Sequence, residues 1–192
     1  SIVTGYNGVG KARLFSGAYP TVDKVDRVDS DNSLDTASGD NGKITISAWV
    51  YQNVDNANLK FILEKGDNTA NNYRFRTNGN ETLNFSWQYP DATWRTWPST
   101  GVVGINAWHH VAVSVTTSNP GTVTGTFYID GAAAGTFAEA ASRPMLNNNK
   151  KVNIGFGEGL AQSSSFPGYI DEPRVYMNNL ALHLKRLDWH IV

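Results

Sequence analysis

The sequence contains no cysteine, so disulfide bridges and thiolate metal sites are excluded. Charge is also scarce: 17% of the 192 residues are Asp, Glu, Lys or Arg, and the formal net charge is −1. Such a chain has no basic field to attract nucleic acid or anionic lipid, so neither partner is expected. There is no uninterrupted run of about 18 apolar residues, and we therefore expect no insertion into a membrane.

The length favours a single domain over residues 1–192, large enough to build one hydrophobic core. The chain begins at Ser1, and its two methionines are Met145 and Met177. We therefore expect a processed protein or an excised module. We expect this module to be monomeric.

Apolar and polar residues alternate with a period of two along most of the chain. The clearest example is KITISAWVY (43–51), in which Ile44, Ile46, Ala48 and Val50 alternate with polar or larger residues. This period is typical of a strand with one buried face, whereas a period of 3.6 would indicate a helix.

Similar alternating segments recur between clusters of Gly, Asn, Asp and Pro, which are typical of turns. They are NYRFRT (72–77), TLNFSWQY (82–89), WHHVAVSV (108–115), TGTFYIDG (124–131), KKVNIGF (150–156) and GYIDEPRVY (168–176). The pattern predicts about eight to eleven strands and an all-β fold, a two-sheet antiparallel β-sandwich of the jelly-roll kind. We expect the stretch 18–42 to be mostly loop.

Several segments resemble, in order, those of the LamG-like (laminin G-like, concanavalin A-like lectin) jelly-roll family. They are GKARLFSG (10–17), VDRVDSDNSLD (25–35), ITISAWVY (44–51), AWHHVAVSV (107–115), GTFYIDGAAAG (125–135) and FPGYIDEPRVY (166–176). The resemblance covers nearly the whole chain and implies a concanavalin A-like sandwich. One departure is that Ser16 replaces the Asp common in the family's first strand.

The resemblance also implies a structural calcium ion between the first and closing strands. Carried over to this chain, it nominates Asp171 together with backbone oxygens around Phe15, Ser16 and Gly17. Calcium prefers six to eight oxygen ligands, and the loss of the Asp at Ser16 removes one of them. The alternative is that Asp171 accepts backbone hydrogen bonds at a corner of the sheet.

Asp171 and Glu172 are the only adjacent pair of carboxylates near the end of an apolar strand. A glycosidase needs two carboxylates on one face, whereas neighbours on a regular strand point to opposite faces. Glu172 and Arg174, two positions apart, share a face and can pair. We therefore expect no catalytic residues and a protein that is not an enzyme.

A segment rich in aromatic residues, NFSWQYPDATWRTWPS (84–99), holds three of the six tryptophans. Trp87 continues an alternating strand and is expected in the core. Flat aromatic rings beside planar polar groups suit the stacking of sugar rings. The predicted carbohydrate-binding residues are Trp94, Trp97, Arg95, Tyr89 and Asp91. The alternative is that Trp94 and Trp97 fold back to cover a sheet edge.

The function we expect is a non-catalytic carbohydrate-binding, lectin-like module that binds a glycan or polysaccharide. It would belong to a larger secreted polysaccharide-degrading enzyme or a cell-surface protein. The first alternative is an adhesion domain that recognises protein, with the aromatic segment as its contact patch. The second is a polysaccharide lyase or glycoside hydrolase with an atypical site.

Overall fold

The computed structural model describes residues 2–8, 11–16, 25–28, 34–35, 42–54, 58–67, 69–117, 121–142, 146–157 and 165–177. These residues form thirteen β-strands in two sheets, and every strand pairing in them is antiparallel. The described residues contain no helix that is long and apolar enough to cross a membrane.

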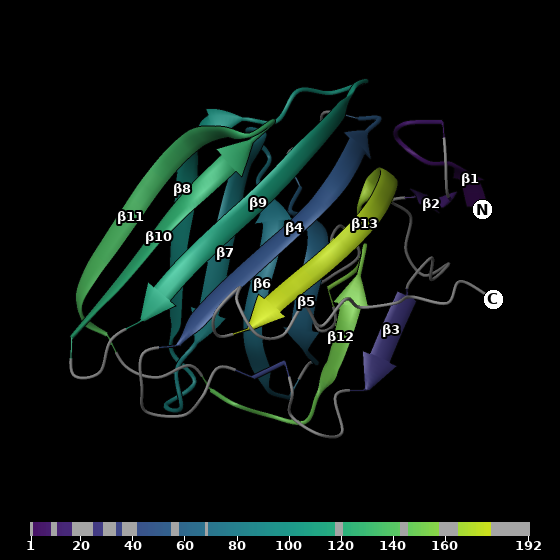
Figure 1. The fold of residues 1–192 in the computed structure, drawn as a ribbon. Helices are drawn as coiled ribbons and strands as arrows, with labels where there is room; N and C mark the ends of the chain where they lie inside the picture. Colours follow the sequence, from purple (N-terminus) through teal and green to yellow (C-terminus); the bar gives the residue numbers. More distant parts are fainter. Residues whose placement is uncertain are drawn as a thin grey trace.

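The larger sheet has seven strands in the spatial order β1-β2-β13-β4-β9-β10-β11 and faces the viewer in Figure 1. Its strands are β1 (Ile2–Thr4), β2 (Lys11–Ser16), β13 (Pro167–Met177), β4 (Lys43–Gln52), β9 (Trp108–Thr117), β10 (Gly121–Ile129) and β11 (Ala132–Ser142). The closing strand β13 therefore lies between the second strand of the chain and the fourth.

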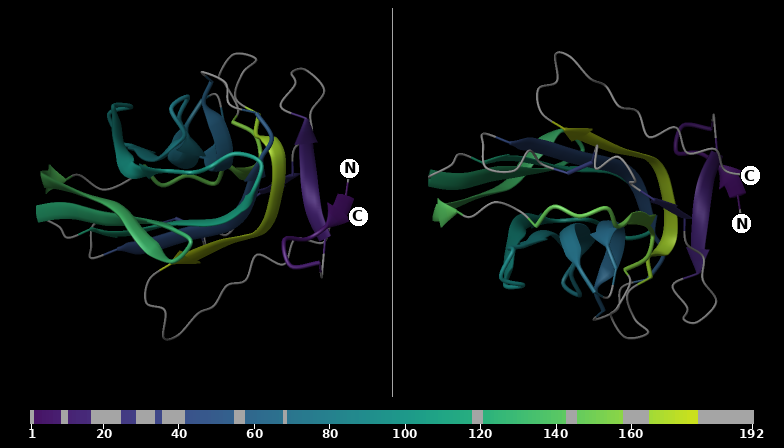
Figure 2. Two further views of the ribbon diagram at one scale, coloured as in Figure 1. Left: turned by 90° about the horizontal axis from the view of Figure 1, so that it is seen from above. Right: turned by 90° about the horizontal axis from the view of Figure 1, so that it is seen from below.

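The smaller sheet has six strands in the order β3-β12-β5-β6-β7-β8 and forms the second layer, which is seen edge-on in Figure 2. Its strands are β3 (Val25–Val28), β12 (Lys151–Ile154), β5 (Lys60–Gly66), β6 (Asn71–Thr77), β7 (Thr82–Gln88) and β8 (Trp94–Val102). The strand β8 is an edge strand of this sheet.

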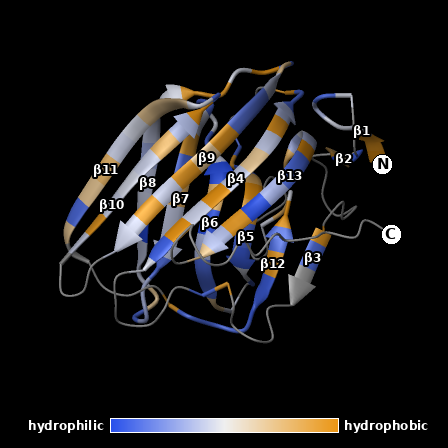
Figure 3. Ribbon diagram, viewed as in Figure 1, coloured by the Kyte–Doolittle hydropathy of each residue, from blue (hydrophilic) through white to orange (hydrophobic). Residues whose placement is uncertain are grey.

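One hydrophobic core fills the space between the two layers. On β4 the residues Ile44, Ile46, Ala48 and Val50 are each at most 1% exposed, whereas the residues between them face away from the core. The same alternation recurs from strand to strand in Figure 3. The prediction of an all-β, two-sheet antiparallel sandwich is confirmed.

The strand count exceeds the expected eight to eleven, because short or interrupted strands give weak sequence signals. β3 lies within the stretch 18–42 that was expected to be mostly loop. The strand β8 begins at Trp94, outside the alternating segments identified in the sequence. Pro98 lies within β8, and a proline is tolerated there because an edge strand needs fewer backbone donors.

The Asp-Gly turn of the larger sheet follows its sequence signal, whereas the closing strand departs from the regular strand expected there. Asp130 and Gly131 connect β10 to β11 with positive φ angles of 52° and 80°, as an Asp-Gly hairpin turn requires. The pairing of β13 with β4 shifts register between Asp171 and Arg174, where Glu172 has a φ of 44°. A β-bulge therefore interrupts the closing strand at its two carboxylates.

Candidate functional site

Two of the predicted carbohydrate-binding residues, Trp97 and Tyr89, lie in the hydrophobic core. Trp97 is 9% exposed and Tyr89 is 1% exposed. The ring of Trp97 stacks on that of Phe137 from the opposite sheet, with centroids 4.6 Å apart. Trp87 is fully buried beside them, as expected. These rings fill the space between the sheets, so the expectation that Trp97 and Tyr89 stack on a ligand at the surface does not agree with their burial.

The other three predicted residues are at the surface, but they do not form a common platform. Trp94 lies half-buried on the outer face of the six-stranded sheet, under the guanidinium of Arg74. Arg95 is exposed, and its Nε donates to Glu139 Oε1 at 2.7 Å, which links β8 to β11. This hydrogen bond and the charge of Glu139 raise the pKa of Arg95.

Asp91 has a structural role in the turn between β7 and β8. Its Oδ1 accepts hydrogen bonds from the backbone N–H of Thr93 at 3.1 Å and from the Thr93 hydroxyl at 2.6 Å. Ala92 has a φ of 64°, and its N–H donates to Tyr89 O at 2.9 Å. The segment 84–99 is therefore a tight hairpin whose alternate side chains point to opposite faces of the sheet.

The paired carboxylates of the closing strand have separate partners. Asp171 is 8% exposed and accepts the backbone N–H of Tyr6 at 3.2 Å and that of Glu172 at 2.8 Å. Burial raises the pKa of Asp171. The exposed Glu172 accepts a 2.7 Å hydrogen bond from Nη2 of Arg174. This is the backbone-anchoring arrangement that the sequence offered as the alternative to calcium.

The residues nominated for calcium are not brought together in the part of the chain that the structure describes. Phe15 and Ser16 pair with Gly168 and Pro167, three and four positions before Asp171 on β13. Three residues of a strand span about 10 Å, so the register offsets these backbone groups from Asp171 along the sheet. Gly17 lies outside the described residues. The calcium ion stays a prediction, and melting with added calcium and with EDTA tests it directly.

An aromatic cluster covers one end of the outer face of the seven-stranded sheet. It consists of Tyr6, Trp49, Tyr51, Trp108 and Tyr169, all of them half-buried. Trp108 is its centre, with ring centroids 5.7 Å from Tyr51, 6.2 Å from Tyr169 and 6.5 Å from Tyr6. Tyr6 stacks on Trp49 with centroids 3.8 Å apart. The rings hold one another in place and leave part of each open to solvent.

Strand register brings these rings together from distant parts of the sequence. Tyr51 of β4 is paired with Trp108 of β9 on one side and with Tyr169 of β13 on the other. Trp49, two positions earlier on β4, lies on the same face. The sequence prediction missed this cluster, although its signal was present: Trp49 and Tyr51 occupy the outward positions of a strand whose inward positions are aliphatic.

The charged side chains next to the aromatic cluster include Asp171, which is held by two backbone N–H groups, and the exposed Glu172 with its partner Arg174. Glu172 and Arg174 neutralise each other there. His110 pairs with Trp49 across the strands and contacts its ring edge, with centroids 5.2 Å apart. Burial lowers the pKa of His110, so the neutral imidazole is favoured at neutral pH. The face therefore suits an uncharged ligand.

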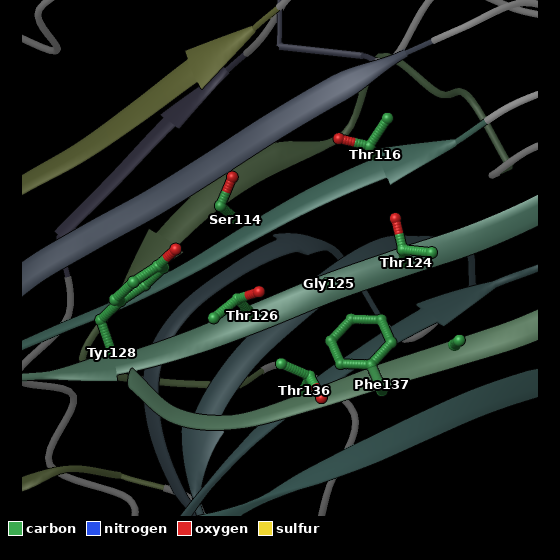
Figure 4. A pocket seen from close by; sticks show the side chains of 9 residues that line it. Ser114, Thr116, Thr124, Gly125, Thr126, Tyr128, Thr136 and Phe137 are labelled. Atoms are coloured by element: carbon green, nitrogen blue, oxygen red, sulfur yellow. The ribbon is translucent and has the colours of Figure 1, made fainter. Parts of the chain in front are cut away.

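A groove lined by hydroxyl groups lies on the same face, over β9, β10 and β11 (Figure 4). Its volume is about 430 Å³. The hydroxyl groove is lined by the hydroxyl-bearing residues Ser114, Thr116, Thr124, Thr126, Tyr128 and Thr136, together with Gly125, Phe137 and Ala138. Each hydroxyl can donate and accept a hydrogen bond, so the groove offers both kinds of partner without charge.

The aromatic cluster and the hydroxyl groove follow one another along the strands of a single sheet. On β9 the outward positions run from Trp108 through His110 and Ala112 to Ser114 and Thr116. Ser114 lies about 20 Å from Trp108 by the rise of a strand. Ala112 and the paired Ser47 are small, and both are 8% exposed. An extended ligand can therefore contact rings at one end and hydroxyls at the other.

Solved structures with similar folds belong to proteins of different kinds. The LG4-5 domains of the mouse laminin α1 chain have a TM-score of 0.61 and 12% identity, with 93% of this chain and 45% of that chain covered. The CBM40 of the Ruminococcus gnavus IT-sialidase, bound to α2,3-sialyllactose, has a TM-score of 0.52 and 19% identity, with coverages of 72% and 76%. The endo-β-1,4-glucuronan lyase of the fungus Trichoderma reesei has a TM-score of 0.56 and 13% identity, with coverages of 91% and 85%.

The three likenesses agree on the fold and do not decide between binding and catalysis, because the identities are low. The chain spans about 45% of the length of the laminin structure. A search of curated proteins found no match. A laminin G family model, described as "Concanavalin A-like lectin/glucanases superfamily", matches residues 26–182. The chain therefore belongs to the concanavalin A-like lectin/glucanase superfamily, as the segments quoted from its sequence had indicated.

Proposed function

We propose that this domain is a non-catalytic carbohydrate-binding module and that its site is the outer face of the seven-stranded sheet. The observation that supports the proposal is the presence, on one face of the sheet, of the aromatic cluster and the hydroxyl groove. Sugar rings present C–H groups that pack on aromatic faces, and hydroxyls that hydrogen-bond to Ser, Thr and Tyr. We propose an uncharged polysaccharide as the ligand of this face.

The mutual contacts of the rings favour binding, because side chains that are already ordered lose little conformational entropy when a ligand arrives. Tyr6 is held by its stacking on Trp49, and its backbone N–H is held by Asp171. In this proposal Asp171 positions the cluster and does no chemistry. A single weak site would gain avidity from attachment to a larger protein that holds it near a polymer.

The two carboxylates of the closing strand support binding rather than hydrolysis. Asp171 accepts two backbone N–H groups, and Glu172 is paired with Arg174, so neither is free to act as an acid or a base. We propose that the chain is secreted or displayed at a cell surface as part of a polysaccharide-degrading enzyme or a surface protein. Incubating the domain with a polysaccharide panel and assaying new reducing ends or unsaturated products tests the absence of catalysis.

The test of the binding site is a screen against neutral polysaccharides with matched tryptophan variants. Trp108→Ala removes the centre of the aromatic cluster and is expected to weaken binding by about tenfold or more. Trp94→Ala is the control, because Trp94 is also half-buried but lies on the other sheet. Binding should resist added salt, since no charge is involved. Equal losses in both variants, or none in Trp108→Ala, would contradict this placement.

A second variant tests the hydroxyl groove without disturbing the rings. Thr126→Val keeps the shape of a side chain in the groove and removes its hydroxyl. Valine has a high preference for strands, so the fold should be retained. We expect a several-fold loss of affinity for long oligosaccharides and little change for short ones that reach only the aromatic cluster.

The aromatic cluster also favours one other candidate, a protein partner. Exposed Trp and Tyr residues are frequent anchors of protein interfaces. Competition separates the two: a free oligosaccharide should displace a glycan-bound domain, and it should not displace one held by a protein. A domain that binds no glycan across a broad panel, while remaining folded, would favour the protein partner.

A further inference from the structure

The outer face of the six-stranded sheet carries two arginines, Arg74 and Arg76, on β6. They lie two positions apart, and their partners on β5 are Glu64 and Phe61 respectively. Glu64 and Phe61 are fully buried, and Arg74 is 8% exposed. Part of the cover over Phe61 is the backbone at Gly157, where an added Cβ would lie 2.8 Å from the phenyl ring. This face is therefore packed as closely as a core, although its side chains are charged.

Arg74 is fully accommodated by its surroundings. Its Nε donates to Glu64 Oε1 at 2.6 Å, which neutralises its charge. Its guanidinium also lies over the ring of Trp94, 4.0 Å from the centroid. This arrangement gives Arg74 a carboxylate on one side and an aromatic face on the other. It explains why Trp94 is half-buried on this sheet, and it means that the Glu64 carboxylate forms its ion pair with Arg74.

Arg76 has no carboxylate partner among the described residues. Its Nε donates to Asn84 Oδ1 at 3.2 Å, and its guanidinium lies 5.5 Å from the centroid of the Phe61 ring. Burial and the positive charge of Arg74 lower the pKa of Arg76 to about 10, against the favourable charge of Glu64. Arg76 therefore stays charged at neutral pH, and two arginines share one glutamate on this face.

We propose that Arg76 binds the carboxylate of an acidic sugar, so that the six-stranded sheet carries a second, anion-specific glycan site. A guanidinium offers two parallel N–H donors that match the two oxygens of a planar carboxylate. The neighbouring edge strand β8 exposes Thr96 and Pro98, which gives the rest of the sugar room to lie over β7 and β8. The choice of a sugar as carrier rests on the proposed glycan-binding function; the choice of an anion rests on Arg76.

The test measures the binding of oligogalacturonate by the whole domain, with its methyl ester and dextran sulfate as companion probes. We expect oligogalacturonate to bind and the methyl ester to bind at least about tenfold more weakly, because the ester lacks the charge that Arg76 pairs with. Binding should weaken as salt is added. Binding of dextran sulfate without oligogalacturonate would overturn the carboxylate assignment, as would equal binding of acid and ester.

The variant Arg76→Gln keeps a hydrogen-bond donor beside Asn84 and removes the charge. It should lower oligogalacturonate affinity about tenfold or more, whereas the control Lys151→Gln, which removes one charge from β12 of the same sheet, should change it little. Oligogalacturonate should raise the melting temperature of the wild type but not that of Arg76→Gln. An Arg76→Gln protein that melts well below the wild type, together with a wild type that ignores oligogalacturonate, would show a merely structural role.

The two proposed sites can be rejected independently of each other by experiment. A domain that loses acidic-sugar binding in Arg76→Gln and shows no neutral-glycan binding would keep this inference and reject the site on the seven-stranded sheet. The converse result, neutral binding that depends on Trp108 and no binding of oligogalacturonate, would reject the site at Arg76 alone.

Discussion

The outer faces of the two sheets both carry aromatic residues, but the rings contact different kinds of neighbour on each sheet. On the seven-stranded sheet, aromatic rings contact one another and uncharged hydroxyls continue the face. On the six-stranded sheet, the rings of Trp94 and Phe61 contact guanidinium groups, and a carboxylate is buried beneath them. An outward position on a strand therefore does not predict that a side chain is exposed.

The largest expected effect is on the free energy of unfolding, and it differs between an inward and an outward tryptophan of β8. Trp97→Ala should lower the free energy of unfolding by about 3–5 kcal/mol, because it leaves a cavity beside Phe137 in the core. Trp94→Ala, three positions away on the outer face, should cost less than about 2 kcal/mol, mostly the loss of its contact with Arg74. Urea unfolding of both variants measures the difference. Similar losses would show that Trp97 is not a core residue.

The next effect compares an ion pair on each sheet. Glu64→Gln leaves Arg74 buried with its charge unpaired, and it should lower the free energy of unfolding by about 3–5 kcal/mol. Glu172→Gln breaks the exposed pair with Arg174 on the other sheet and should cost about 1 kcal/mol at most. Thermal melting at one protein concentration compares them. A mild effect of Glu64→Gln would mean that the face around Arg74 is wetter than its burial indicates.

The smallest effect is a pH dependence that arises from Asp171 on the seven-stranded sheet. Burial raises the folded-state pKa of Asp171 above its ordinary value of 3.8, so the folded protein holds this proton more tightly than the unfolded chain does. The stabilising contribution is present in full below pH 3.8 and is lost as the pH rises through the raised pKa.

Asp171→Asn cannot titrate, so the stability of the wild type relative to this variant should fall between about pH 3 and 6. The measurement is the free energy of urea unfolding of both proteins across that range. Parallel pH profiles would show that Asp171 titrates in the folded protein as it does in the unfolded chain. Arg76, whose pKa is about 10, contributes nothing in this range.

The fold followed from the sequence because inward and outward residues alternate along each strand. Ile44 to Val50 identified their strand and its buried face without any knowledge of the partners. The order of the quoted segments then indicated the family. The segment 84–99 was misread for a local reason: Pro90 and Pro98 and the polar residues between them resemble a loop, whereas the chain makes a hairpin that ends on a sheet edge.

The candidate site could not be predicted from single strands, because the pairing of strands determines which aromatic residues become neighbours. Tyr51, Trp108 and Tyr169 come from three strands far apart in the sequence, and only the order β13-β4-β9 makes them neighbours. Arg76 likewise gave no signal, since its lack of a carboxylate partner depends on Glu64 being taken by Arg74. The local sequence pattern predicts which face of the sheet a residue occupies, and the strand register determines which side chains lie next to it.

The measurement that tests the central claim most directly is the affinity of the wild type, Trp108→Ala and Trp94→Ala for a neutral polysaccharide identified in the screen. Titration followed by calorimetry, on proteins shown to be folded, avoids changes in tryptophan fluorescence caused by the substitutions themselves. We expect a loss of about tenfold or more in Trp108→Ala and near wild-type affinity in Trp94→Ala. Full affinity in folded Trp108→Ala would contradict the assignment of the seven-stranded sheet as the binding face.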